Sequence, residues 1–206
     1  MPNCVGCIDC THIYLRAPNN NAQVYINRKG RASINTQAIV DADLRFVNVV
    51  ARWPGSTHDA FIWENSHVCQ DFRNGRFPSG WLLGDSGYGL QPWLLTPILR
   101  PQSAAEERYN NSLTSTRTCV ERAFGLLKAR FRCLDRSGGV LCYSPERVCK
   151  IILSCCVLHN MCVNRQLPLP DGLVVQPHDP DQHEQPVAHH HGGVDARNRV
   201  IQTFFS

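Results

Sequence analysis

The sequence predicts an α/β fold in which a mixed sheet, made of a three-strand meander and crossover strands, is flanked by helices. Three segments rich in β-branched, aromatic and cysteine side chains lie close together at residues 4–15, 33–40 and 46–52, as is typical of consecutive strands. A helical segment separates them from a short apolar segment at 81–84. Two long helical segments follow, which places helices beside the sheet.

The composition fits a single domain with a hydrophobic core, since 43% of the 206 residues are hydrophobic and 18% are charged. The formal charge of +4 permits a nucleic-acid partner without requiring one. No segment approaches the roughly 18 apolar residues of a membrane span, and residues 1–20 lack a secretion signal. We therefore expect no membrane association, and we expect the eleven cysteines to be reduced thiols in the nucleus or the cytoplasm.

The first three strands are separated by turn-forming residues. Residues 16–29 are polar and contain Pro18 and three consecutive asparagines, which predicts a loop or a wide hairpin connection. The second and third strands form a hairpin around residues 41–43, and Pro54 with Gly55 ends the third strand.

The following segments connect the meander to the fourth strand. A helix is expected at residues 58–68, after a serine and a threonine that are suited to capping it. A loop follows at 69–80, and the short apolar segment at 81–84 is the fourth strand. Residues 91–99 are expected to be irregular or helical, because two prolines interrupt them.

Two long helices are expected in the second half of the chain. Apolar residues recur at steps of three and four between residues 118 and 134, which predicts an amphipathic helix. Residues 101–117 before it are polar and are expected to form a loop or one helical turn at 104–109. A second helix runs from Ser144 to residue 163, and it is expected to be buried because it is apolar on most sides.

The composition divides the chain into three regions. Residues 1–165 are expected to form the folded domain. Residues 166–194 are rich in proline and histidine and are expected to be a disordered tail. Residues 195–206 recover helical spacing and are expected to form a short C-terminal helix.

Four acidic residues have positions that suggest chemistry. Asp9 interrupts a buried strand, where an unpaired carboxylate is costly. Asp59 begins the first helix, Asp85 follows the fourth strand, and Glu121 lies in the first turn of the first long helix. Because the first and fourth strands are expected to be neighbours, their carboxylates would meet at one edge of the sheet. Carboxylate oxygens suit Mg²⁺ or Mn²⁺, and two such ions activate water against a phosphodiester.

Three of these acidic residues also have purely structural explanations. Asp59 is favoured at the start of a helix, and Asp85 is typical of a turn. Glu121 is able to pair with Arg117 or with Lys128 on the same helix. The aspartate at the centre of the first strand has few explanations of this kind.

Basic residues accompany Glu121 on the long helix. Lys128 and Arg132 share a helical face with Glu121, so they are positioned to hold phosphates. We expect DNA contacts at Lys128, Arg130 and Arg132.

The cysteines are not expected to form a metal site. Cys4, Cys7 and Cys10 have a spacing seen in zinc and iron–sulfur proteins, but steps of three along a strand point to alternate faces. On the second long helix, His159 and Cys155 share a face, and core packing is the favoured explanation.

Several blocks of the sequence resemble, in order, the DDE-superfamily domain of PIF/Harbinger transposases, most closely its domesticated vertebrate branch. They include GCIDCTHI, RWPGSTHDAFIW, WLLGDSGYGL, CVERAFGLLKARFRCL and ILSCCVLHNMC. The resemblance covers about residues 4–165, and the final VIQTFFS is also similar. It implies an RNase H-like fold and a divalent-metal nuclease that acts on DNA.

The resemblance also implies site residues and a partner. It places the metal ligands at Asp9, Asp59, Asp85 and Glu121. On topology the expected catalytic triad is Asp9, Asp85 and Glu121, and which aspartate is its middle member stays open. The family carries a helix-turn-helix-like region before the first strand that has no counterpart in this sequence. A separate Myb/SANT-like nuclear protein is therefore expected to supply DNA contact and nuclear entry.

Two functions are compatible with the sequence. The first is a nuclease that hydrolyses DNA phosphodiester bonds with Mg²⁺ or Mn²⁺. The alternative is a catalytically weak nuclear scaffold that binds a Myb/SANT-like DNA-binding partner. The presence of all four acidic residues favours the nuclease.

Overall fold

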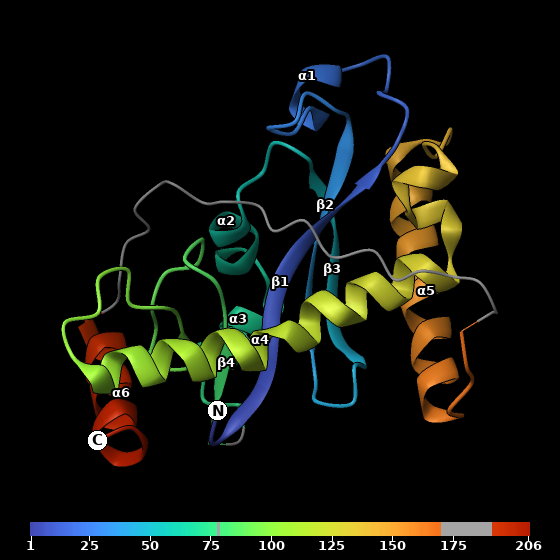
Figure 1. The fold of residues 1–206 in the computed structure, drawn as a ribbon. Helices are drawn as coiled ribbons and strands as arrows, with labels where there is room; N and C mark the ends of the chain where they lie inside the picture. The colour runs from blue at the N-terminus through green and yellow to red at the C-terminus, as the bar shows by residue number, and fades with distance from the viewer. Residues whose placement is uncertain (78, 170–190) are drawn as a thin grey trace.

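The computed structural model of the chain describes residues 1–77, 79–169 and 191–206. They form a five-stranded mixed sheet with helices on both faces (Figure 1). The strands are β1 (Cys4–Tyr14), β2 (Ser33–Val40), β3 (Phe46–Pro54), β4 (Trp81–Leu83) and β5 (Leu94–Leu95). The helices are α1 (Ala22–Tyr25), α2 (Asp59–Glu64), α3 (His67–Arg73), α4 (Ala104–Arg130), α5 (Pro145–Asn164) and α6 (His191–Phe204), with 3-10 turns at Arg132–Leu134 and Arg136–Gly138.

The order of strands across the sheet is β3-β2-β1-β4-β5. β1, β2 and β3 pair antiparallel as a meander, whereas β4 pairs parallel to β1 and β5 pairs parallel to β4. Parallel pairing requires a crossover connection, and α2 with α3 supplies it between β3 and β4. The predicted mixed sheet, with the first and fourth strands side by side, is therefore confirmed.

Two hydrophobic clusters cover the two faces of the sheet, because side chains alternate along β1. Cys7 and Ile13 pack with residues of α4, α5 and α6, whereas Ile8 packs with residues of α2 and α3. Figure 1 shows α4 crossing β1, with α2 and α5 on opposite sides of the strands. We call the side of the sheet covered by α4, α5 and α6 the α4 face, and the side covered by α2 and α3 the α2 face.

Helix α4 begins at Ala104, well before the predicted start of the long helix. The Ser103 hydroxyl caps it by accepting a backbone N–H at 3.3 Å. Tyr109 and Leu113 are fully buried, so they extend the apolar stripe into the segment that was expected to be a loop or one helical turn at 104–109. Glu121 therefore lies in the interior of the helix, and its expected place in the first turn is wrong.

The helix predicted at residues 58–68 is in fact two helices, α2 and α3. Ser66 separates them, because its hydroxyl accepts the Cys69 N–H at 3.1 Å and donates to the Trp63 carbonyl at 2.7 Å. The segment at 91–99, expected to be irregular or helical, contains β5. This strand has two residues, which is too short to show a periodic pattern.

Helix α5 lies at the surface, contrary to the expectation that it is buried on most sides. Ile152 and Cys155 face the core, whereas Leu153, Val157 and Met161 are exposed. Within the described ranges, no helix combines the length and the apolar character that a membrane crossing needs.

Helix α6 begins at His191, inside the region predicted to be a tail at 166–194. Its Val200 and Ile201 pack into the cluster of the α4 face. Residues 170–190 of that region lie outside the described residues. The division of the chain into a domain, a tail and a terminal helix therefore stays a prediction.

His159 of α5 is fully buried, in agreement with its expected place in the core. Its Nε2 donates to the Leu44 carbonyl at 3.0 Å, and its ring meets Phe46 edge-on at 5.1 Å between centroids. Burial lowers the pKa of His159 below its ordinary value, because a charged ring at this position loses its hydration. Protonation of His159 therefore opposes folding.

We expect the wild type to lose stability relative to a His159→Gln variant as the pH falls from about 7 to about 5. The unfolded chain takes up a proton on His159 near pH 6.5, while the folded chain resists it, so the stability present above that pH is lost below it. The difference in unfolding free energy between the wild type and His159→Gln changes by at most about 1.4 kcal/mol per pH unit. Urea denaturation at several pH values measures it, with His67→Gln at an exposed position as the control. A pH-independent difference between the wild type and His159→Gln would contradict this account.

Candidate active site

Asp9 lies in the interior of β1 and points to the α4 face, where it is 6% exposed. Its Oδ1 accepts the backbone N–H of Cys10 at 2.8 Å. Its Oδ2 accepts a hydrogen bond from the Arg117 guanidinium at 2.9 Å, which forms a buried ion pair. The cation that a carboxylate in a strand interior requires is therefore supplied by α4.

The charges of three carboxylates act on Arg117. Burial disfavours its charge, but Asp9, Asp85 and Glu121 outweigh this effect and raise its pKa. Glu121 is one helical turn from Arg117 on α4, the spacing at which side chains of a helix are neighbours. The guanidinium is thus the common positive charge of this group.

The pairing of β1 with β4 explains how Asp85 joins the group. Cys7 pairs with Leu83 in the parallel register, so the same offset brings Asp85 level with Asp9. Neighbouring residues in a parallel pair point to the same face of a sheet. The Oδ1 atom of Asp85 also accepts the Gly87 N–H at 2.9 Å, which fixes the turn after the strand.

Asp59 approaches β1 from the α2 face. Its Oδ1 accepts a hydrogen bond from Asn35 at 2.9 Å, and Asn35 pairs with His12, which points away from Asp9 along the same strand. The charge of Asp59 still acts on Asp9 and contributes to raising its pKa. The four predicted acidic residues are therefore divided, with three on the α4 face and Asp59 on the other side.

A polar network holds the loop of Asp59 against the sheet. Gln37 Nε2 donates to the Asp59 backbone carbonyl and to the Tyr88 hydroxyl, both at 3.3 Å. The Tyr88 hydroxyl is also 3.4 Å from the Cys10 thiol. All of these groups are buried, so Asp59 is fixed by contacts that are shielded from water.

The electrostatic state of Asp9 follows from this arrangement. Burial raises the pKa of the Asp9 carboxyl to about 7, with Arg117 opposing the shift and Asp85 and Asp59 adding to it. The Arg117 guanidinium therefore does not fully offset the loss of hydration and the charges of the neighbouring carboxylates. A further cation at this place would relieve their mutual repulsion.

The donor set fits a hard divalent cation in kind, since it consists of carboxylate oxygens. In residues 1–77, 79–169 and 191–206, no three Asp, Glu, His or Cys side chains are grouped closely enough to hold one ion. Arg117 occupies one oxygen of Asp9 instead. The prediction at the sequence level named Arg117 only as a partner of Glu121, because the helix was expected to begin after it.

The predicted DNA-binding residues differ in their surroundings. Lys128 Nζ donates to Thr11 Oγ1 at 2.7 Å, and Thr11 shares the face of Asp9 on β1. Arg130 donates to the Leu167 carbonyl at 2.6 Å. Arg132 lies beyond the end of α4 and contacts Ser137, so it does not share a helical face with Glu121. Their contacts with DNA stay a prediction.

The cysteines at the start of β1 correct one expectation. Cys4 and Cys119 pack in the same cluster as Cys7, and their thiols contribute to raising its pKa. The pairing of β1 with β4 is irregular between Cys4 and Gly6, which breaks the strict alternation of the strand. Cys4 and Cys7 therefore converge, whereas Cys10 points to Tyr88 on the α2 face.

The sequence of residues 8–160 matches the family model described as "DDE superfamily endonuclease". This range includes Asp9, Asp59, Asp85 and Glu121. The chain belongs to the DDE superfamily endonuclease family. The resemblance inferred from the sequence blocks is therefore confirmed, and no solved structure matches this DDE superfamily domain significantly.

Similar proteins come from animals and plants. The chain is 40% identical over 188 residues to the mouse protein named "Putative nuclease HARBI1", covering 89% of this chain and 54% of the relative. The human protein of the same name is 43% identical over 161 residues, covering 78% and 46%. "Protein ALP1-like" of Arabidopsis thaliana is 33% identical over 198 residues, covering 87% and 48%. The chain thus spans about half the length of these curated relatives.

We expect Arg117→Gln to lower the free energy of unfolding of the DDE superfamily domain by about 3 kcal/mol, since it leaves the Asp9 carboxylate buried without its partner. The double variant with Asp9→Asn is expected to lose less than the sum of the two single variants, because both charges are removed together. Urea denaturation in the presence of a metal chelator measures these values. Arg122→Gln, at an exposed position of α4, is the control, and an equal loss in both arginine variants would contradict the assigned ion pair.

Proposed function

We propose that the chain is a divalent-metal-dependent nuclease that hydrolyses phosphodiester bonds of DNA. The observation that supports this most directly is the buried ion pair of Asp9 with Arg117, a guanidinium on which the charges of Asp85 and Glu121 also act. A buried carboxylate with a perturbed pKa, as Asp9 has, is typical of functional sites. Membership of the endonuclease family also supports nuclease activity.

We also propose that the sheet is RNase H-like. The support is the strand order β3-β2-β1-β4-β5, with an antiparallel meander followed by two parallel strands. This order places the interior of β1 beside the end of β4, so acidic residues distant in the chain become neighbours. The long helix α4 then crosses over the same position.

In this proposal Asp9, Asp85 and Glu121 hold Mg²⁺ or Mn²⁺, and Asp59 supports the site from the α2 face. The bound cation supplies an activated water and stabilises the charge that develops on the phosphoryl group. Arg117 has to release Oδ2 of Asp9 for this oxygen to serve as a ligand. The charge of Arg117 then stays within the group of carboxylates, where it limits their repulsion.

Basic residues of α4 position the DNA strand in the proposed reaction. Lys128 is held on the same face as Asp9 through its bond to Thr11, which supports a role in contacting phosphate. Lysine and arginine contacts to phosphate fix the register of a strand without reading its sequence. Arg130 and Arg132 are proposed to extend this contact beyond the end of the helix.

A second candidate function is a nuclear scaffold for a Myb/SANT-like DNA-binding protein. The exposed apolar side chains of α5 favour it, because such side chains on one helix face are typical of protein contacts. They include Leu153, Val157, Leu158 and Met161. Residence in both nucleus and cytoplasm is proposed with this function as with the first.

We expect the wild type to cleave plasmid DNA in Mg²⁺ or Mn²⁺, and Asp9→Asn or Glu121→Gln to reduce the rate on the order of 1,000-fold. A loss of about 4 kcal/mol of transition-state stabilisation is the size expected for a lost metal ligand. Glu107→Gln, an exposed position on the same helix, is the matched control and is expected to keep full activity. Cleavage is followed by the conversion of supercoiled to nicked plasmid.

Calorimetric titration with Mn²⁺ separates the two candidate functions. Heat of binding in the wild type that disappears in Asp9→Asn supports the nuclease. No cation binding and no cleavage, together with a stable complex with a Myb/SANT-like protein, would replace the nuclease with the scaffold. Equal cleavage by the wild type and Asp9→Asn would reject the proposed site.

A further inference from the structure

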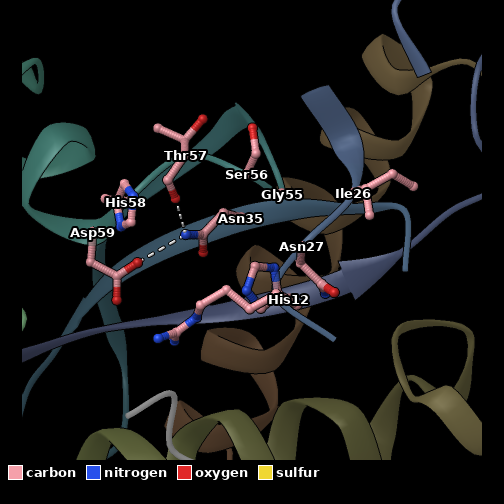
Figure 2. Close-up of a pocket in the computed structure, with 10 residues that line it drawn as sticks. His12, Ile26, Asn27, Asn35, Gly55, Ser56, Thr57, His58 and Asp59 are labelled. Atoms are coloured by element: carbon pink, nitrogen blue, oxygen red, sulfur yellow. Dashed lines mark hydrogen bonds between the residues drawn. The ribbon is translucent and has the colours of Figure 1, made fainter. Parts of the chain in front are cut away.

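A cavity of about 220 Å³ opens on the α2 face of the sheet next to Asp59 (Figure 2). Its lining includes the paired strand residues His12 and Asn35, and the segment before β2 with Asn27 and Arg28. The loop between β3 and α2 completes the wall. The cavity lies on the face opposite to Arg117, and of its lining residues only Asp59 has a role in the site proposed above.

The floor of the cavity is fixed by a chain of hydrogen bonds. Asn27 is 5% exposed, and its Nδ2 donates to Ser33 Oγ at 3.2 Å. Ser33 Oγ lies 3.0 Å from His12 Nδ1. Ser33 Oγ thus links Asn27 to His12 across the floor of the cavity. A Cβ at Gly55 would lie 2.2 Å from Ser33 Oγ, so only glycine allows the loop to approach β2 this closely.

Asn35 fixes the side of the cavity next to the carboxylates. Its Nδ2 donates to the Thr57 carbonyl at 2.8 Å and to Asp59 Oδ1 at 2.9 Å, as Figure 2 shows. Its Oδ1 has no hydrogen-bond partner among the described residues, although Asn35 is 2% exposed. A buried acceptor without a partner destabilises a fold. Asn35 orients Asp59 in spite of this cost, through the hydrogen bond from its Nδ2.

The rim carries groups that are suited to a phosphate. Arg28 and His58 are exposed there, and Ser56 and Thr57 add hydroxyl groups. Arginine and hydroxyl side chains are among the usual protein contacts to phosphate oxygens. The residues that line the cavity include no Phe, Tyr or Trp ring on which a nucleobase could stack. The chemistry of the lining therefore favours a phosphate over a base.

The carboxylate in the lining does not prevent this contact. Asp59 is 4% exposed and is turned toward Asn35 at the floor, whereas Arg28 and His58 stand at the exposed rim. Repulsion by Asp59 keeps an anion away from the floor and leaves it at the rim. The cavity thus favours binding of an anion at its rim and disfavours it at its floor.

Asp59 also relates the cavity to the carboxylates of the α4 face, since Asn35 holds it and Asn35 pairs with His12, three residues from Asp9 on β1. A DNA strand with one phosphate at those carboxylates carries further phosphates on either side. We propose that the rim of this cavity binds a phosphate of the DNA strand near the one that is cleaved, with Arg28 as its cationic contact and the His58 ring as a hydrogen-bond donor. This inference rests on the proposed function, because it assigns a second contact to the same strand.

The test is DNA binding by the full chain, measured as fluorescence anisotropy of a labelled oligonucleotide with Ca²⁺ and at several salt concentrations. Arg28→Ala is expected to raise Kd on the order of tenfold and to reduce the slope of log Kd against log salt by about 0.7–0.9, as one lost phosphate contact does. Lys29→Ala removes the same charge from the next exposed residue, which does not line the cavity, and is expected to keep the wild-type slope. Thermal melting verifies that both variants fold.

The outcomes distinguish this contact from the function on which it rests. Equal slopes for Arg28→Ala and Lys29→Ala, with weakened binding by Lys128→Ala, would overturn the contact and leave the nuclease intact. Absence of DNA binding by the wild type would reject both. Affinity for inorganic phosphate that depends on Arg28, without an effect of Arg28→Ala on DNA, would assign the cavity to a small anion and overturn the contact with the strand.

Discussion

The buried ion pair between Asp9 and Arg117 constrains the whole α4 face. A carboxylate in the interior of a strand requires a cation, and here the cation is 108 positions away in the chain. To present it, α4 has to extend well before Glu121 and to cross β1. The adjacency of β1 and β4 then brings Asp85 to the same guanidinium. The length and placement of one helix are thus tied to the charge balance of one strand.

The charge of Arg117 does not fully offset the effects that disfavour a charged Asp9, and this matters for the proposed chemistry. Burial and the neighbouring carboxylates hold the pKa of Asp9 at about 7 in spite of the adjacent Arg117. A folded chain keeps such repulsion at a cost in stability, and natural proteins do so mainly where function requires it. In the proposed nuclease, this excess of negative charge is the condition under which a divalent cation binds favourably.

Strand β1 presents two different polar surfaces because its side chains alternate. Asp9 and Thr11 face α4, while Cys10 and His12 face the side of α2 and the cavity. Asp59 belongs to the second surface, and its charge acts across the strand on the first. In the proposed nuclease, the DNA strand contacts both surfaces, with one phosphate at the carboxylates and another at the rim of the cavity.

The sequence by itself determined the strands of the meander, the adjacency of the first and fourth strands, and the family, because these follow from residue type and from motifs in order. It did not determine where α4 begins, since the polar residues before Arg117 hide two buried positions, Tyr109 and Leu113, that only packing reveals. The tertiary structure alone decided which carboxylates share a guanidinium. Strand register and side-chain alternation place Asp85 with Asp9 and Asp59 on the opposite face, and these are relations between distant residues that no local pattern contains.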